Sequence, residues 1–254
     1  MFEASPFKLN MFLRCPMQYK FQYVDKLGSI YRKPRPYFTM GDHVHAALKD
    51  FLSITPNSER NITKLENLLR EKWQRNRKGF KDKEDEKRWG QKAIKQLQWF
   101  AQTHDLSITT FKVEDYHKVA LTEDITLIGR IDRIDQEADD SLHIIDYKTG
   151  KLPAEIDQVQ LHVYALILTK ELQLPISKAS YLYLEPGKWQ TIEPTSADLD
   201  KAQSYIADLV DKICAERDYP ARPNEYCGNC DFLEICPEKE IATESALDDE
   251  ELDF

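Results

Sequence analysis

The sequence predicts an α/β protein: a sheet core flanked by helices, a helical N-terminal insertion and a small cysteine-bearing cap. Up to Asp105, apolar residues recur at helical spacing. Beyond it, the pattern changes to short runs of β-branched and aromatic residues separated by turn residues. Three of the five cysteines then lie close together near the C-terminal end. A chain of 254 residues is long enough to bury a substantial core, as one large domain or two small ones.

The N-terminal half is expected to be helical. Ser5 and Pro6 are typical of an N-cap followed by a first-turn proline, which predicts an aromatic-rich helix extending to about Val24. Apolar residues at helical spacing predict three further helices, over 41–52, 62–77 and 84–103.

The second half should supply the sheet. Three strands are expected in succession, followed by a helix, a pair of strands and a last helix that Ser196 caps. The expected strands are 111–121, 125–134, 142–148, 178–184 and 189–192, and the intervening helix is 156–172. Cys214 is expected on the buried side of the last helix, beside Ile213 and Val210.

The formal net charge of −9 does not exclude nucleic acid, because the charges are unevenly distributed. Six acids lie in the last 14 residues, so residues 1–240 carry only −3, and residues 64–95 hold twelve bases against six acids. The longest apolar run, Val163 to Leu168, is too short for a membrane span, and no secretory signal is visible. A soluble cytoplasmic protein without a membrane partner is therefore expected.

One stretch combines two carboxylates and an amine. Asp146 and Lys148 alternate along one strand and project from the same side, and hairpin pairing would bring Asp132 of the preceding strand beside Asp146. An isolated Asp-x-Lys is typical of a solvated ion pair, but apolar residues such as Ile144 share the face of Asp146. Converging buried charges are costly without a function, and hard oxygen ligands suit Mg²⁺ or Mn²⁺. This combination favours a metal site.

Four motifs occur in one order: Gly-Asp-His-Val-His at 41–45, Gly-Arg-Ile-Asp at 129–132, Ile-Asp-Tyr-Lys-Thr-Gly at 145–150 and Gln-Leu-His-Val-Tyr at 160–164. Together they resemble the RecB-type branch of the PD-(D/E)XK nuclease superfamily. The resemblance implies a restriction-endonuclease-like mixed sheet. It also implies that His45, Asp132, Asp146 and the backbone carbonyl of Tyr147 bind a divalent metal ion.

The resemblance further assigns the activation of water to Lys148, and places Gln160 and Tyr164 at the same site as supports for Lys148 or the DNA strand. His43 is an alternative to His45, although the family spacing favours His45. Glu114 resembles a family acid on the first strand, or else is a solvated edge charge. Asp135 is interpreted as a turn residue. Arg130 and Arg133 either contact phosphates or pair with neighbouring acids.

Cysteines lie at both ends of the chain. Cys227, Cys230 and Cys236 are close in sequence, and Cys15 near the N-terminus is the plausible fourth partner. Thiolate quartets bind zinc or an iron–sulfur cluster. The pattern resembles the [4Fe–4S] staple of AddB-type recombination nucleases and CRISPR-associated iron–sulfur exonucleases, with Zn²⁺ as the alternative.

The expected organisation is an N-terminal segment 1–40, a helical region 41–105 with the metal-site histidine, a nuclease core 106–218, a cysteine cap 219–240 and an acidic disordered tail 241–254. Basic residues where the expected helices 62–77 and 84–103 meet, among them Lys72, Arg75 and Lys78, form a candidate phosphate-binding wall, and Arg130 is a further candidate DNA contact. Aromatic residues near the N-terminus alternate with lysines and arginines, and they either stack on the nucleobases of single-stranded DNA or pack against the cysteine cap.

The predicted activity is that of a Mg²⁺- or Mn²⁺-dependent deoxyribonuclease, an exonuclease that prefers single strands, in DNA repair, recombination or CRISPR adaptation. The phosphate-binding pattern GxxxxGK[ST] does not occur, so a helicase or CRISPR adaptation protein would act in trans. The alternative is a non-catalytic DNA-binding or assembly subunit on a nuclease fold.

Overall fold

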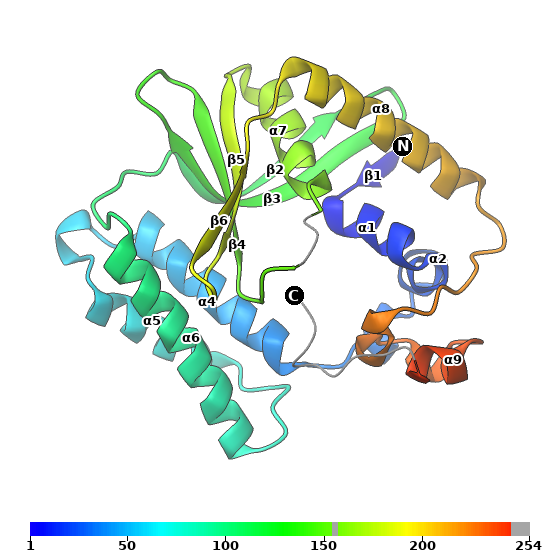
Figure 1. Cartoon of the computed structure of the whole chain (residues 1–254), viewed down its shortest axis with the longest axis horizontal. Helices are drawn as coiled ribbons and strands as arrows, with labels where there is room; N and C mark the ends of the chain where they lie inside the picture. Colours follow the sequence, from blue (N-terminus) through cyan, green and yellow to red (C-terminus); the bar gives the residue numbers. More distant parts are fainter. Residues whose placement is uncertain (154–156, 245–254) are drawn as a thin grey trace.

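A six-stranded mixed sheet forms the centre of the computed structural model, which describes residues 1–153 and 157–244 (Figure 1). The strands are β1 (Phe2–Ala4), β2 (Lys112–Ala120), β3 (Ile125–Gln136), β4 (Leu142–Lys148), β5 (Ile176–Tyr183) and β6 (Lys188–Ile192). Their order is β1-β3-β4-β5-β6, with β2 also paired to β3. β1 with β3 and β4 with β5 are parallel, whereas the other pairs are antiparallel. The predicted mixed α/β class is thus confirmed.

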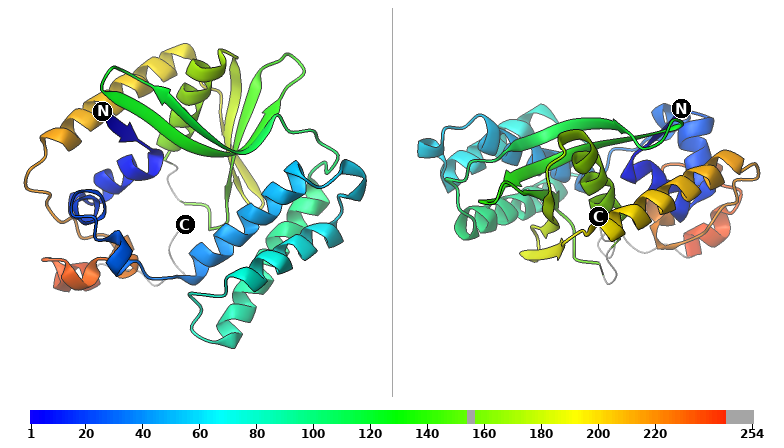
Figure 2. Two further views of the ribbon diagram at one scale, coloured as in Figure 1. Left: turned by 180° about the vertical axis from the view of Figure 1, so that it is seen from behind. Right: turned by 90° about the horizontal axis from the view of Figure 1, so that it is seen from above.

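Helices cover both sides of this sheet (Figures 1 and 2). The helices are α1 (Pro6–Arg14), α2 (Pro16–Tyr19), α3 (Gly28–Tyr31), α4 (Pro36–Ser53), α5 (Ile62–Arg75), α6 (Lys83–Thr103), α7 (Val159–Leu172), α8 (Ser196–Ala215) and α9 (Lys239–Glu244). One apolar cluster joins α1, α7 and α8 to the sheet, and a second joins α4, α5 and α6 to β4 and β5. The charged α5 and α6 bury only narrow apolar stripes, whereas α7 is buried along most of its length.

The cysteine cap packs against the N-terminal segment that follows α1 (Figure 1). The cap contains two short 3₁₀ turns, Glu225–Asn229 and Leu233–Ile235, followed by α9. Phe232 of the cap is buried, and its ring lies 5.5 Å from that of Phe21 and 6.1 Å from that of Tyr31. Phe21 and Tyr31, both half-buried, therefore pack against the cap.

Several local expectations require correction. The first helix ends at Arg14, and Cys15 is an extended residue before Pro16 starts α2, because the residue before a proline is disfavoured in helical conformation. Thr195, not Ser196, is the N-cap of α8, since its hydroxyl accepts from the Asp198 N–H in a capping box. Cys214 is exposed, so its predicted burial is wrong.

Other differences concern the ends of elements. The short strand β1 was not predicted, because three residues carry too weak a pattern. The expected start of the 156–172 helix lies outside the described residues, which resume at 157, and α7 begins at Val159. Of the expected tail, residues 241–244 belong to α9 and the rest lie outside the described residues. No helix in the described ranges is long and apolar enough to cross a membrane.

Candidate active site

Four elements meet around the predicted metal residues. The end of β4 carries Asp146 and Lys148, the adjacent strand β3 carries Asp132, α4 carries His45, and α7 carries Gln160. The antiparallel register pairs Arg133 with Ile145, so that Asp132 and Asp146 are neighbours across the two strands. The structure therefore brings together the side chains that the motifs single out.

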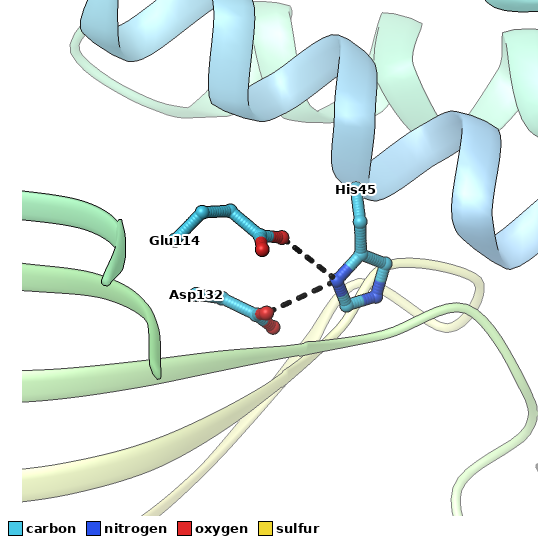
Figure 3. Close-up of side chains that lie close together, drawn as sticks. All are labelled: His45, Glu114 and Asp132. Atoms are coloured by element: carbon cyan, nitrogen blue, oxygen red, sulfur yellow. Dashed lines mark ion pairs between the residues drawn. The ribbon is translucent and has the colours of Figure 1, made fainter. Parts of the chain in front are cut away.

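His45 points from α4 toward two carboxylates of the sheet (Figure 3). Its Nδ1 lies 3.2 Å from Asp132 Oδ1 and 3.9 Å from Glu114 Oε1. The other oxygen of Asp132 accepts a 2.8 Å hydrogen bond from the backbone N–H of Tyr147. The alternative histidine, His43, is buried, and its Nε2 lies 2.8 Å from the carbonyl of Asn76. Because it is two residues from His45, it lies on the opposite face of α4, away from these acids. His45 is the histidine at the site.

A hydrogen-bonded chain links Asp146 to α7. Lys148 Nζ lies 2.8 Å from Asp146 Oδ2 and donates to Gln160 Oε1 at 2.8 Å. The Gln160 amide donates in turn to Asp146 Oδ1 at 2.8 Å and contacts the Tyr164 hydroxyl at 2.9 Å. Gln160 thereby fixes the positions of the Asp146 carboxylate and the Lys148 amine relative to each other. Tyr164, one helical turn later, holds Gln160 in place.

Glycines at two motif positions allow the helices to come this close. A Cβ on Gly129 would lie 2.8 Å from Cε1 of Tyr164, so only glycine lets the α7 ring rest against β3. A Cβ on Gly41 would lie 3.3 Å from the Thr149 hydroxyl, which indicates a close approach of α4 to the end of β4. These contacts position His45 and Gln160 over the carboxylates.

The electrostatics of the cluster favour a cation among the carboxylates. Burial acts to lower the pKa of His45, but Asp132, Asp146 and Glu114 outweigh it and raise that pKa to about 9. Burial raises the pKa of Asp146; the Lys148 ammonium opposes this effect and the Asp132 charge adds to it. Burial and the neighbouring Asp132 also raise the pKa of Glu114. Without a bound cation, a proton on His45 offsets part of this negative charge.

The residues present fit a divalent metal ion. Ligand atoms of His45, Glu114 and Asp132 lie within 4.8 Å of one another. Asp146 Oδ2 is buried without a hydrogen-bond partner and has only the ion pair with Lys148. Two or three carboxylates with one imidazole are a donor set that suits Mg²⁺ or Mn²⁺.

Glu114 is the site residue that sequence reasoning left undecided. It lies near the start of β2, where its φ of 51° is in the left-handed region, a costly conformation for a residue with a side chain. Its carboxylate is largely buried and faces His45 instead of solvent. A single acid at a strand start carries no spacing signal, so only the structure could separate the two interpretations.

The predicted DNA-contacting bases have different surroundings. Arg130 is exposed and lies 3.8 Å from Glu114. Lys72 is nearly buried in an ion pair with Asp50, whereas Arg75 and Lys78 are exposed. Arg133 cannot reach a phosphate, because it is buried and forms a two-pronged ion pair with Asp135. Asp135 is accordingly a buried strand residue and not the predicted turn residue.

The four candidate cluster cysteines gather between the N-terminal segment and the cap. Burial and the neighbouring thiols of Cys15, Cys227 and Cys236 raise the pKa of Cys230 to about 11. Arg35 donates to the carbonyl of Asn229 at 3.0 Å, and Arg222 donates to that of Leu13 at 2.8 Å. Cys15 is thus brought to the other three, which are far away in sequence.

The mixed sheet, with paired acids and a lysine where β3 and β4 adjoin, defines the class of metal-dependent nucleases. The chain belongs to the PD-(D/E)XK nuclease superfamily, whose family model matches residues 3–237. No curated protein matches the chain.

Several solved structures are similar to this chain, and two of them illustrate the degree of similarity. A protein from Eubacterium rectale named a putative exonuclease is 12% identical with a TM-score of 0.56, covering 93% of this chain and 86% of that one. The structure of SSO0001 is 16% identical with a TM-score of 0.48 and the same coverage. The first similarity supports the fold.

Proposed function

We propose that this protein is a divalent-metal-dependent deoxyribonuclease that acts as an exonuclease on single-stranded DNA. The observation that carries the proposal is the junction of Asp146, Lys148 and Gln160 with Asp132 and His45 in one buried cluster. Apolar residues would stabilise the fold at least as well as such a buried cluster of charges, which indicates that the cluster serves a function. The name of the similar Eubacterium rectale protein agrees with exonuclease action.

The protein residues have distinct roles in this proposal. Asp132 and Asp146 would hold the ion, with His45, Glu114 and the carbonyl of Tyr147 completing its shell. When bound, a divalent ion polarises the phosphodiester and lowers the pKa of a water molecule. Lys148 lies beside Asp146 and would orient that water as an ammonium or, after losing its own proton to solvent, accept one from it. Gln160 and Tyr164 act as positioning residues, because they reach the reacting groups only through Lys148 and Asp146.

We further propose the RecB-type assignment and a structural [4Fe–4S] cluster on Cys15, Cys227, Cys230 and Cys236. A zinc ribbon usually has two Cys-x-x-Cys pairs, whereas this chain has only one, at Cys227 and Cys230. The cysteine pattern therefore favours a cluster over zinc. The proposed roles are DNA repair, recombination or CRISPR adaptation, with a helicase or adaptation protein as a separate partner.

The proposal is tested with linear and circular single-stranded DNA and with the matching duplexes. With Mn²⁺ or Mg²⁺, linear single strands labelled at one end should be degraded to short products, circular single strands should stay intact, and EDTA should stop the reaction. Cleavage of circular single strands would show that the protein is an endonuclease and not an exonuclease. Absence of cleavage on every substrate, despite metal binding, would favour a non-catalytic DNA-binding subunit.

A further inference from the structure

The surface beside Glu114 carries one exposed aromatic residue and two basic side chains. Tyr116 is 55% exposed and lies directly opposite Arg130 in the β2–β3 register. Side chains of such a cross-strand pair lie on the same face of the sheet. The two basic side chains, Arg130 and Lys49, are close enough that their positive charges act to lower the pKa of Glu114.

Arg130 and Lys49 both adjoin the site, and Tyr116 follows Glu114 by two residues along β2. Arg130 reaches to 3.8 Å from Glu114, whose other oxygen lies 3.9 Å from His45. Lys49 follows His45 by one turn of α4 and is exposed, so it stands on the same side of the helix. A strand whose scissile phosphate lies at the carboxylates therefore meets two positive charges and one aromatic ring at the adjacent nucleotide.

We propose that Tyr116 stacks on a base of single-stranded DNA next to the cleaved bond, while Arg130 and Lys49 bind the neighbouring phosphates. This inference rests on the proposed nuclease function and adds the basis for its strand preference. A base is free to stack on a protein ring only where it is unpaired, and stacking is tolerant of sequence. A duplex presents its bases to each other, so Tyr116 favours single strands.

The test compares Tyr116→Ala and Tyr116→Phe, with Tyr205→Ala as control. Tyr205, on α8, is a similarly exposed tyrosine outside the site. Tyr116→Ala should raise the KM for a single-stranded oligonucleotide about tenfold and leave kcat unchanged, whereas Tyr116→Phe should resemble the wild type. A single abasic residue, moved along the oligonucleotide, should weaken wild-type binding at one position and have no further effect on Tyr116→Ala.

A purely structural role would not depend on the missing base. The inference would be overturned if Tyr116→Ala and Tyr205→Ala had the same KM. It would also be overturned if the abasic residue weakened binding equally in the wild type and in Tyr116→Ala. Either result would leave the nuclease function intact. Fluorescence anisotropy with Ca²⁺ in place of Mg²⁺ or Mn²⁺ measures the affinity of this surface for the oligonucleotide in the absence of cleavage. A missing nuclease activity is then distinguished from a missing stacking site. Arg130→Ala and Lys49→Ala should each lower the salt dependence of binding by about one released counterion.

Discussion

At the scale of single residues, the site is a balance between buried carboxylates and the few cations available to them. His45 is the group that adjusts, because its ring touches Asp132 and faces Glu114. Its pKa of about 9 lies above the ordinary 6.5, so the metal-free folded protein binds this proton more tightly than the unfolded chain.

A pH dependence of stability follows for protein kept in EDTA. The raised pKa of His45 contributes stability that is fully present below pH 6.5 and is lost as the pH rises to about 9. The free energy of unfolding should fall by up to about 3 kcal/mol over this window. Urea unfolding at pH 6.5 and 9 measures the effect. His45→Gln should flatten it, and an equal loss in this variant would assign the effect to other groups.

Gly129 permits a second prediction at this scale. In Gly129→Ala the new methyl group would meet the Tyr164 ring at 2.8 Å, and that ring would have to move together with Gln160. We expect a destabilisation of about 1–3 kcal/mol and a lower kcat. Thermal unfolding and cleavage rates measure the two effects. Adding Tyr164→Leu should restore stability but not kcat; recovery of both would show that the ring has no positioning role.

Sequence motifs predicted which residues lie together where the motifs fix the spacing, and they gave no guide where it is not fixed. The structure assembles His45, Asp132, Asp146, Lys148 and Gln160 as the motifs imply. Glu114 depends on an unusual backbone conformation and Asp135 on a buried partner, Arg133, and neither feature has a sequence pattern. Cys214 shows that an apolar neighbour such as Ile213 does not establish the orientation of a residue.

At the scale of elements, α4 must be held firmly, because it presents His45 to the sheet. Arg60 anchors the C-terminal end of this helix. Its guanidinium donates to the carbonyls of Leu52, Thr55, Leu106 and Ile108 at 2.7–3.3 Å, joining the end of α4 to the segment after α6.

Replacing Arg60 should therefore weaken the helical layer. Arg60→Met leaves four carbonyls without this donor, and we expect a loss of roughly 2–4 kcal/mol in the free energy of unfolding. The control is Arg70→Ala, which removes an exposed pair with Glu66 and should cost under about 1 kcal/mol. Denaturant unfolding compares the two, and equal losses would contradict the anchoring role.

Elements with a clear apolar pattern were predictable, although α4 begins at Pro36, five residues before the expected start at Gly41. The apolar periodicity located α5 and α6 within two residues of their observed ends, and β4 at its observed ends. β1 was missed because its stability comes from parallel pairing with β3, which no local pattern encodes. The break between α1 and α2 reflects the conformation that Pro16 imposes on Cys15.

At the scale of the whole molecule, the cap joins the two ends of the described chain. Its contacts with the N-terminal segment are mostly polar and aromatic, and Phe232 supplies its main buried ring. So little apolar burial is typical of a small unit that a metal centre stabilises. The pairing of distant segments such as these could be inferred from the cysteines alone, since no helix or strand pattern signals it.

The proposed cluster predicts a brown protein after anaerobic purification. Broad absorbance near about 400 nm and roughly four irons per chain are expected. Cys15→Ala and Cys230→Ala should lose the colour and unfold at lower temperature, whereas Cys214→Ala should keep both properties, because Cys214 is exposed on α8. A colourless protein with one bound zinc ion would contradict the cluster and keep the joining of the chain ends.

We expect Asp146 and Lys148 to form a catalytic centre in which the two residues have distinct roles. The most direct test is single-turnover cleavage of single-stranded DNA with Mn²⁺, together with metal binding, for Asp146→Ala and Lys148→Ala against the exposed controls Asp211→Ala and Lys188→Ala. Both site variants should stay folded and lose at least about a thousandfold in rate, and only Asp146→Ala should also lose metal affinity. Cleavage by either site variant at rates close to those of the controls would contradict this account.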